Sequence, residues 1–135
     1  MRIFETCTRV RYAETDATAI VYYGNYFVYF ELGRVEMFRE VGLPYDRRLP
    51  IVETHCRYHA SAAFDEHLRI ETFVQEARRT SFRLGSRVYR LAPDDAEPPL
   101  LLVEGWATMV TVDDDNRPVP LPAAFREAFD GLVVG

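Results

Sequence analysis

The chain has 135 residues with 48% hydrophobic content, which is enough to build a core and too apolar for a disordered chain. Its net charge of −5 gives no general attraction to nucleic acid or to anionic lipid. The N-terminal segment carries scattered charges, and no apolar run has the length of a signal-peptide core or a membrane span. We therefore expect one cytoplasmic domain over residues 1–135, with no nucleic acid and no membrane among its partners.

The first expected element is a strand from Ile3 to Tyr12, a stretch rich in β-branched and aromatic residues. A polar turn that contains Asp16 follows it. Acidic residues in such turns usually face solvent or cap backbone N–H groups. Two features favour catalysis here. The apolar neighbours from Ile20 to Tyr23 are expected to raise the pKa of the carboxyl, and the helix that follows offers N–H groups for an oxyanion.

The longest helical pattern runs from Tyr26 to Val41. Its apolar side chains recur at steps of three and four, which predicts one buried stripe. Glu31 and Arg34 lie outside that stripe, where an ion pair between residues three apart is the simplest interpretation. Asn25 is expected to cap the start of the helix, and Gly42 is expected to end it in a Schellman motif.

Four strand patterns follow the helix. Residues Ile51 to Ala62 alternate in polarity, which predicts a strand with one buried face, and Leu68 to Gln75 and Phe82 to Tyr89 alternate in the same way. The connection from Arg78 to Thr80 makes the last two a hairpin with a basic tip. Leu100 to Val112 is apolar on both faces at its start, which is typical of a central strand.

A short helix from Pro122 to Asp130 closes the chain. The order of strand, long helix and four strands predicts an α+β fold, with an antiparallel sheet and one helix packed across it. The strand from Ile51 to Ala62 has an edge that a second copy of the chain would protect. We therefore expect at least a homodimer.

The segment from Asp16 to Tyr26, DATAIVYYGNY, resembles the active-site segment of hotdog-fold thioesterases of the 4-hydroxybenzoyl-CoA thioesterase type. It is also similar to that of the Tol-Pal-associated acyl-CoA thioesterases. The similarity continues at collinear spacing through Phe30-Glu31, Arg34, Gly42-Leu43-Pro44, Pro50-Ile51-Val52, Ile70-Glu71-Thr72 and Arg78-Arg79-Thr80-Ser81-Phe82. It covers most of the chain, and this is more specific than a short motif. The resemblance implies a hotdog fold, an antiparallel five-stranded sheet wrapped around one long central helix.

The resemblance also implies the chemistry. Asp16 would act as nucleophile or general base on an acyl-CoA thioester, and the backbone N–H of Tyr23 would polarise the thioester carbonyl. Arg78 and Arg79, with Ser81 beside them, would bind the substrate at the CoA phosphates, a role that the basic hairpin tip suggests independently. The active site would lie between two subunits of a homodimer, and two dimers would form a tetramer. No metal is expected, and no cofactor besides the CoA of the substrate.

Two positions qualify this interpretation. The family glycine is Ala19 in this chain, and alanine would strain the turn if that position has a positive φ. Glu31 matches a family position near the active site, so a supporting role for it stays open. The residues do not identify the acyl group, because the tyrosines and phenylalanines near the proposed site suit both aromatic and aliphatic groups.

Several alternatives stay open. A non-catalytic acyl-CoA-binding hotdog module is one, although Asp16 counts against it, and a thioesterase for acyl-carrier-protein thioesters is another. A hydratase usually needs a histidine paired with the acid, and none lies in the Asp16 loop. His55 and His59 fall on the outer face of their strand, where solvated or interface histidines are the simpler interpretation. Cys7 and Cys56 lack metal or redox spacing and are expected to be buried free thiols.

Overall fold

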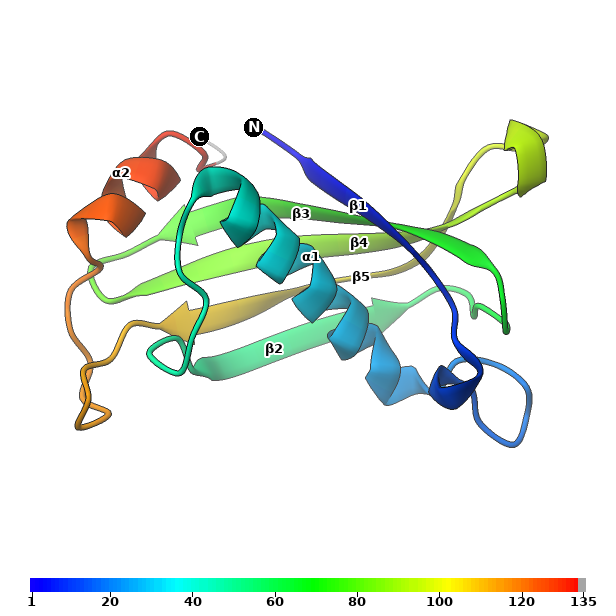
Figure 1. The fold of residues 1–135 in the computed structure, drawn as a ribbon, viewed down its shortest axis with the longest axis horizontal. Coiled ribbons are helices and arrows are strands. Elements are labelled where there is room, and N and C mark those ends of the chain that lie inside the picture. The colour runs from blue at the N-terminus through cyan, green and yellow to red at the C-terminus, as the bar shows by residue number, and fades with distance from the viewer. Residues whose placement is uncertain (134–135) are drawn as a thin grey trace.

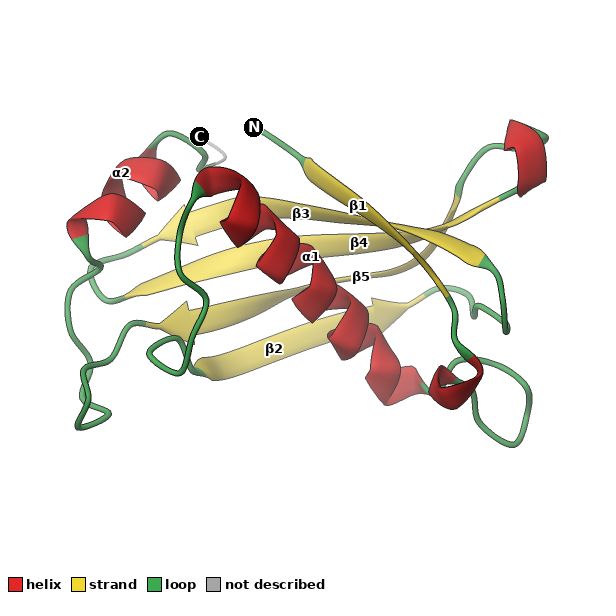
Figure 2. Cartoon of the chain, in the orientation of Figure 1, coloured by secondary structure: helices red, strands yellow, loops and turns green. Residues whose placement is uncertain are grey.

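The structure is a computed structural model that describes residues 1–133, and it contains one antiparallel sheet crossed by one long helix (Figures 1 and 2). The strands are β1 (Phe4–Arg9), β2 (Ile51–Tyr58), β3 (His67–Ala77), β4 (Ser81–Leu91) and β5 (Leu100–Val110), and the helices are α1 (Tyr26–Val41) and α2 (Ala123–Asp130). The strand order is β1-β3-β4-β5-β2, with all neighbours antiparallel. The predicted five strands and long helix are confirmed.

The apolar stripe of α1 packs on the sheet. The C-terminal end of the helix has the predicted Schellman motif. The helix ends at Gly42, whose φ of 77° lies in the left-handed region that favours glycine. Gly42 N–H donates to the Arg39 carbonyl (3.3 Å), and Leu43 N–H donates to the Phe38 carbonyl (2.9 Å). These two bonds are the Schellman pattern, so the predicted motif is confirmed.

The start of α1 differs from the prediction. Asn25 precedes the first α-helical residue, but its side chain forms no cap, and its Nδ2 donates instead to the Glu14 carbonyl (2.9 Å). A 3-10 turn over Tyr23–Asn25 continues directly into the helix. Asn25 therefore has helical backbone angles, φ −73° and ψ −12°, whereas a capping residue usually has an extended backbone. The capping prediction is wrong for this reason.

The edge strand β2 has little buried surface. All of its residues are exposed except Cys56, which is half-buried. Ile51 and Val52 are 45% and 60% exposed. The predicted buried face is therefore wrong for the chain by itself, because one side of β2 pairs with β5 and its other edge ends the sheet. The buried Ala62, predicted as part of the strand, lies beyond its end.

The strand β5 lies between β4 and β2, so the prediction of a central strand is confirmed. Gly105 allows the close approach of a neighbour there, since a Cβ at this position would lie 2.0 Å from the His55 carbonyl oxygen. His55 stacks on Trp106, and His59 lies 3.4 Å from Glu104. Both histidines therefore have partners on the strand beside them.

The core consists of two clusters under the two halves of α1. The cluster at its C-terminal half is aromatic, with the rings of Phe82 and Phe129 at a centroid distance of 4.7 Å, and it joins α2 to the sheet. Tyr26, Tyr29 and Phe30 anchor the other cluster, and each such side chain contributes about 1.5 to 3 kcal/mol by burial. Cys7 is exposed, and Cys56 is half-buried against the cluster of Tyr26, Tyr29 and Phe30, so the prediction of two buried thiols is wrong.

Candidate active site

Asp16 lies in a tight loop before the start of α1. Its Oδ1 accepts hydrogen bonds from the backbone N–H and the hydroxyl of Thr18, at 2.8 and 2.5 Å. The N–H of Asp16 donates to the Ile20 carbonyl (2.9 Å), and the N–H of Ala19 donates to the Asp16 carbonyl (3.0 Å). The turn therefore closes on itself and holds the carboxylate in one orientation.

The pKa of Asp16 lies below its ordinary value, because the hydroxyl and the backbone N–H of Thr18 both stabilise the carboxylate. The sequence predicts a rise instead, from burial by apolar neighbours. That prediction is wrong, because Ile20, Tyr22 and Tyr23 are themselves exposed and leave the carboxyl in contact with water. Asp16 is therefore ionised near neutral pH, as a nucleophile or a general base must be.

The backbone strain expected at Ala19, the glycine position of the family, is present in the loop. Ala19 has a φ of 66°, in the left-handed region. For an L-residue with a Cβ, this conformation is about 1 to 2 kcal/mol higher in free energy than the right-handed region. The hydrogen bonds of the Asp16 turn therefore hold a strained backbone.

The first turn of the helical segment begins beside this loop. Tyr22 N–H donates to the Glu14 carbonyl (3.0 Å), and Asn25 N–H donates to the Tyr22 carbonyl (2.8 Å). Tyr23 and Gly24 lie between Tyr22 and Asn25, and their N–H groups donate to no acceptor within residues 1–133. The pKa of the Tyr22 phenol is raised, chiefly by the Tyr23 hydroxyl and also by the charge of Asp16. The carboxylate and the two N–H donors thus belong to one small region.

The other predicted residues lie at the hairpin tip between β3 and β4. Arg78 N–H donates to the Ser81 carbonyl (2.7 Å), and the Arg79 carbonyl accepts the N–H of Leu121 (2.9 Å). The Arg78 side chain is 72% exposed, with its Nε 3.3 Å from a Glu76 carboxylate oxygen. The predicted basic tip is present, and its arginines face solvent in this chain.

One chain does not bring Asp16 and the hairpin tip together. His67, at the start of β3, pairs with Arg9 near the Asp16 loop, and β3 runs from there to Ala77 at the tip. This strand is about 33 Å long at about 3.3 Å per residue. In Figure 1 the β3–β4 tip lies beside α2, whereas the loop before α1 lies at the opposite end of the sheet. The two predicted groups are therefore far apart within one chain.

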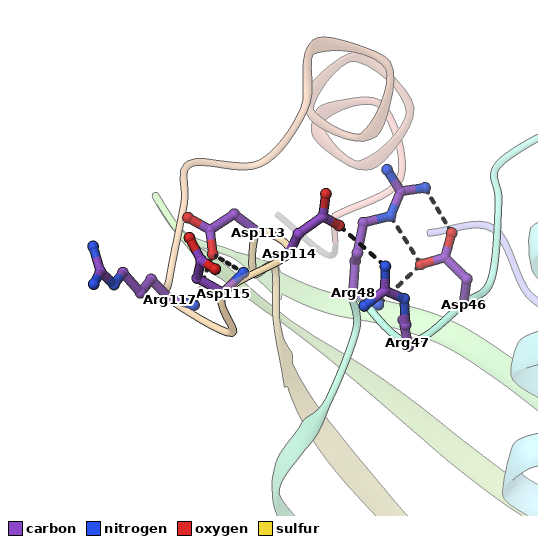
Figure 3. Close-up of polar contacts among 7 residues, drawn as sticks. All are labelled: Asp46, Arg47, Arg48, Asp113, Asp114, Asp115 and Arg117. Atoms are coloured by element: carbon purple, nitrogen blue, oxygen red, sulfur yellow. Dashed lines mark hydrogen bonds and ion pairs between the residues drawn. The ribbon is translucent and has the colours of Figure 1, made fainter.

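Figure 3 shows a cluster of charged side chains, and Thr111 at the end of β5 links this region to the hairpin tip by donating its N–H to the Thr80 carbonyl (3.0 Å). The loop after α1 and the turn after β5 meet there, with Arg48 2.6 Å from Asp46 and Arg47 3.2 Å from Asp114. The Arg48 side chain lowers the pKa of Asp46 to about 2. Since acidic and basic groups satisfy one another here, we assign this cluster no role in the chemistry. Residues 1–133 contain no group of His, Cys, Asp and Glu side chains arranged for a metal ion.

Sequence patterns missed the buried polar residues Glu14 and Arg34. Arg34 is 3% exposed, and its Nε donates to the Tyr45 hydroxyl (3.3 Å). It forms no ion pair with Glu31 in the part of the chain that the structure describes, so the expected intrahelical pair is wrong. Glu31 and Arg34 instead line a groove of about 180 Å³ between α1 and β2. Periodicity did not predict the burial of Glu14 or Arg34, because charged residues are ordinarily placed on the solvent side of a pattern.

Comparison with known proteins identifies the family. A family model described as the thioesterase superfamily matches residues 18–96, more than half of the chain. The chain belongs to the thioesterase superfamily. It is 32% identical over 134 residues to the acyl-CoA thioester hydrolase YbgC of Escherichia coli, with 94% of this chain and 96% of that protein covered. It is 30% identical over 129 residues to the 4-hydroxybenzoyl-CoA thioesterase of Pseudomonas sp. strain CBS-3, with 88% and 92% covered.

Solved structures of this superfamily share the fold. One is an Asp-to-Asn mutant of a 4-hydroxybenzoyl-CoA thioesterase in complex with 4-hydroxybenzoyl-CoA, with a TM-score of 0.84, 26% identity, and coverage of 96% of this chain and 99% of that one. The predicted hotdog fold and the predicted thioester hydrolase are confirmed at the level of the family. Within residues 1–133 no helix combines the length and the apolar character needed to cross a membrane.

Proposed function

We propose that this superfamily member hydrolyses acyl-CoA thioesters to the free acid and CoA, with Asp16 as nucleophile or general base. The observation that carries the proposal is the Asp16 carboxylate, kept ionised by Thr18 in the loop that leads into the helical turn of Tyr23. The names of the related acyl-CoA thioesterases support the substrate class. The relative whose substrate complex was solved as an Asp-to-Asn mutant supports an aspartate as the reacting group.

The proposed reaction places the thioester carbonyl oxygen at the Tyr23 N–H. Negative charge develops on this oxygen when the carbonyl carbon is attacked, and a backbone donor at a helix start stabilises it. In one route an Asp16 oxygen attacks the carbon, CoA leaves as the thiolate, and water then cleaves the acyl anhydride. In the other route Asp16 takes a proton from the water that attacks. Both routes start from an ionised carboxylate.

The proposed site needs a second copy of the chain. Asp16 and the hairpin tip lie at opposite ends of the sheet, and the β2 edge between them exposes Ile51 and Val52. If β2 pairs with β2 of a second copy around a two-fold axis, the two strands are antiparallel, and the two sheets run in opposite directions. The Asp16 end of one chain would then lie toward the Arg78 and Arg79 end of the other. A tetramer of two such dimers is a further proposal, which rests on the family resemblance alone.

The replacement Asp16→Asn tests this function. Asparagine keeps the size and polarity of the side chain but cannot attack or take a proton, so we expect kcat for an acyl-CoA to fall by ~10² or more. The matched control is Asp46→Asn. Asp46 also accepts the backbone N–H of the residue two positions later, that of Arg48 (2.9 Å), but it lies in the loop after α1 (Figure 3). The control should keep the parental kcat.

The substrate for the assay is a panel of aromatic, short-chain and long-chain acyl-CoAs, because the acyl group is not known. Turnover of none of them by the parent, with binding retained, would favour a non-catalytic acyl-CoA-binding module. Full turnover by Asp16→Asn would remove Asp16 from the mechanism. Circular dichroism of both variants checks that the fold is unchanged.

A further inference from the structure

Glu14 is a buried carboxylate that neither route of hydrolysis uses. It is 7% exposed and lies two residues before Asp16. Its Oε1 accepts the hydroxyl of Tyr29 (2.9 Å) and the backbone N–H of Arg11 (2.8 Å), and its Oε2 accepts the Arg11 Nε (3.1 Å). Tyr29 is fully buried in α1. A hydrogen bond inside the core therefore ties the segment before Asp16 to the body of the helix.

The backbone carbonyl of Glu14 holds the start of the helical segment as well. It accepts the N–H of Tyr22 (3.0 Å) and the Nδ2 of Asn25 (2.9 Å). These two residues flank the N–H groups of Tyr23 and Gly24, the proposed oxyanion donors. One residue is thus bonded through its side chain to α1 and through its carbonyl to both sides of the donor turn.

We propose that Glu14 and Tyr29 are positioning residues, which fix the Asp16 carboxylate relative to the Tyr23 N–H. This inference rests on the proposed function. After Asp16 the loop is anchored by Val21, which is buried and donates its N–H to the Ala62 carbonyl (2.9 Å), but Ala19 between them holds a strained backbone. Before Asp16 the anchor is Glu14. Misplacement of a reacting group by about 1 Å can reduce a rate by about 10²-fold. A buried bond between Glu14 and Tyr29 resists such movement, because both groups lose a hydrogen-bond partner if the loop shifts.

The chemistry of the pair suits a permanent bond. Burial and the neighbouring Glu14 both raise the pKa of the Tyr29 phenol, so its hydroxyl stays protonated and remains a donor. Arg11 supplies two further donors to the same carboxylate, one of them charged. The network therefore has an acceptor for each donor, and its geometry does not depend on the substrate.

The replacement Tyr29→Phe tests the inference by removing one oxygen atom. We expect kcat for an acyl-CoA to fall about 10-fold while KM changes less than about 2-fold, because the alignment of the reacting groups changes and the binding contacts do not. Amide hydrogen exchange over residues 15–22 should become faster. The matched control is Tyr45→Phe. Tyr45 lies beyond the other end of α1, and the replacement removes its hydroxyl bond to Arg34, so kcat and the exchange rates should stay at parental values.

Two variants at Glu14 separate positioning from a general loss of stability. Glu14→Ala should lower kcat by about 10²-fold, and Glu14→Gln should restore it to within about 5-fold, because the amide oxygen still accepts the Tyr29 hydroxyl. If Tyr29→Phe folds and shows the parental kcat and exchange rates, the positioning role is wrong even though the proposed function stands. If Asp16→Asn retains full turnover, the proposed role of Asp16 fails, and absence of turnover by the parent would overturn the proposed hydrolysis. The exchange measurement then still decides whether the bond anchors the loop.

Discussion

The two ends of the sheet use polar side chains in opposite ways. At the Asp16 end, Glu14 and Tyr29 form a buried hydrogen bond, and the carbonyl of Glu14 holds the start of the helical segment. At the hairpin tip, Arg78 is 72% exposed and has one ion pair with a partly exposed glutamate. The contrast fits the proposed division of labour. Groups that act on the transition state need fixed geometry, whereas groups that hold a distant phosphate contribute equally before and during the reaction.

The largest effect at the hairpin tip is expected from replacing Arg78 and Arg79 together with alanine. If they bind the CoA phosphates, KM for an acyl-CoA should rise by ~10-fold or more and kcat should stay unchanged, because uniform binding affects KM alone. Steady-state kinetics at low and high salt measure this, and the difference from the parent should shrink at high salt.

A thioester without the nucleotide is the control for this double variant. An acyl-N-acetylcysteamine has no phosphates, so the variant and the parent should hydrolyse it equally well. An unchanged KM for every acyl-CoA would show that the arginines are ordinary surface residues. It would also favour the alternative in which the acyl group arrives on a carrier protein.

A smaller effect is expected from Thr18→Val, which removes the hydroxyl donor to Asp16. The two Thr18 donors lower the pKa of Asp16 from its ordinary 3.8, so Asp16 stays ionised to lower pH in the parent. Loss of one donor destabilises the ionised form and raises this pKa. The acid limb of the pH profile of kcat/KM should therefore move to higher pH. An acid limb that stays in place or moves to lower pH would contradict the role of Thr18.

The smallest effect concerns the strained turn. Ala19→Gly should increase the free energy of unfolding by up to about 1 kcal/mol, because glycine adopts the observed φ of 66° without a Cβ clash. The gain is limited by the greater freedom of glycine in the unfolded chain. Ala17→Gly in the same loop is the control, since Ala17 is not among the positive-φ residues, and it should bring no gain. Urea denaturation measures both, and a less stable Ala19→Gly variant would refute the strain.

The sequence predicts the elements whose signals are local. The apolar steps in α1, Gly42 at its end and the β3–β4 hairpin are all confirmed, because periodicity and turn chemistry act over a few residues. The direction of the Asp16 pKa was not predictable in this way. It depends on whether neighbouring side chains cover the carboxyl, and the chain by itself leaves Tyr22 and Tyr23 exposed.

Other errors have a tertiary cause. The alternation in β2 predicts a buried face, but β2 ends the sheet and all of its residues except Cys56 are exposed. Glu14 and Arg34 are buried although both are charged, and only the folded structure reveals the hydroxyls of Tyr29 and Tyr45 that accompany them. A charged residue gives the same sequence signal whether it faces water or a buried partner.

The central claim is that Asp16 of one chain acts with Arg78 and Arg79 of another. A hybrid dimer tests it, made from one Asp16→Asn chain and one chain in which both arginines are alanine, purified through two different tags. Its first composite site has Asp16 from the second chain and both arginines from the first, so it is intact. We expect the parental KM with about half of the parental kcat per dimer. A hybrid with the raised KM of the arginine-free homodimer would show that each chain uses its own arginines, and it would contradict the shared site.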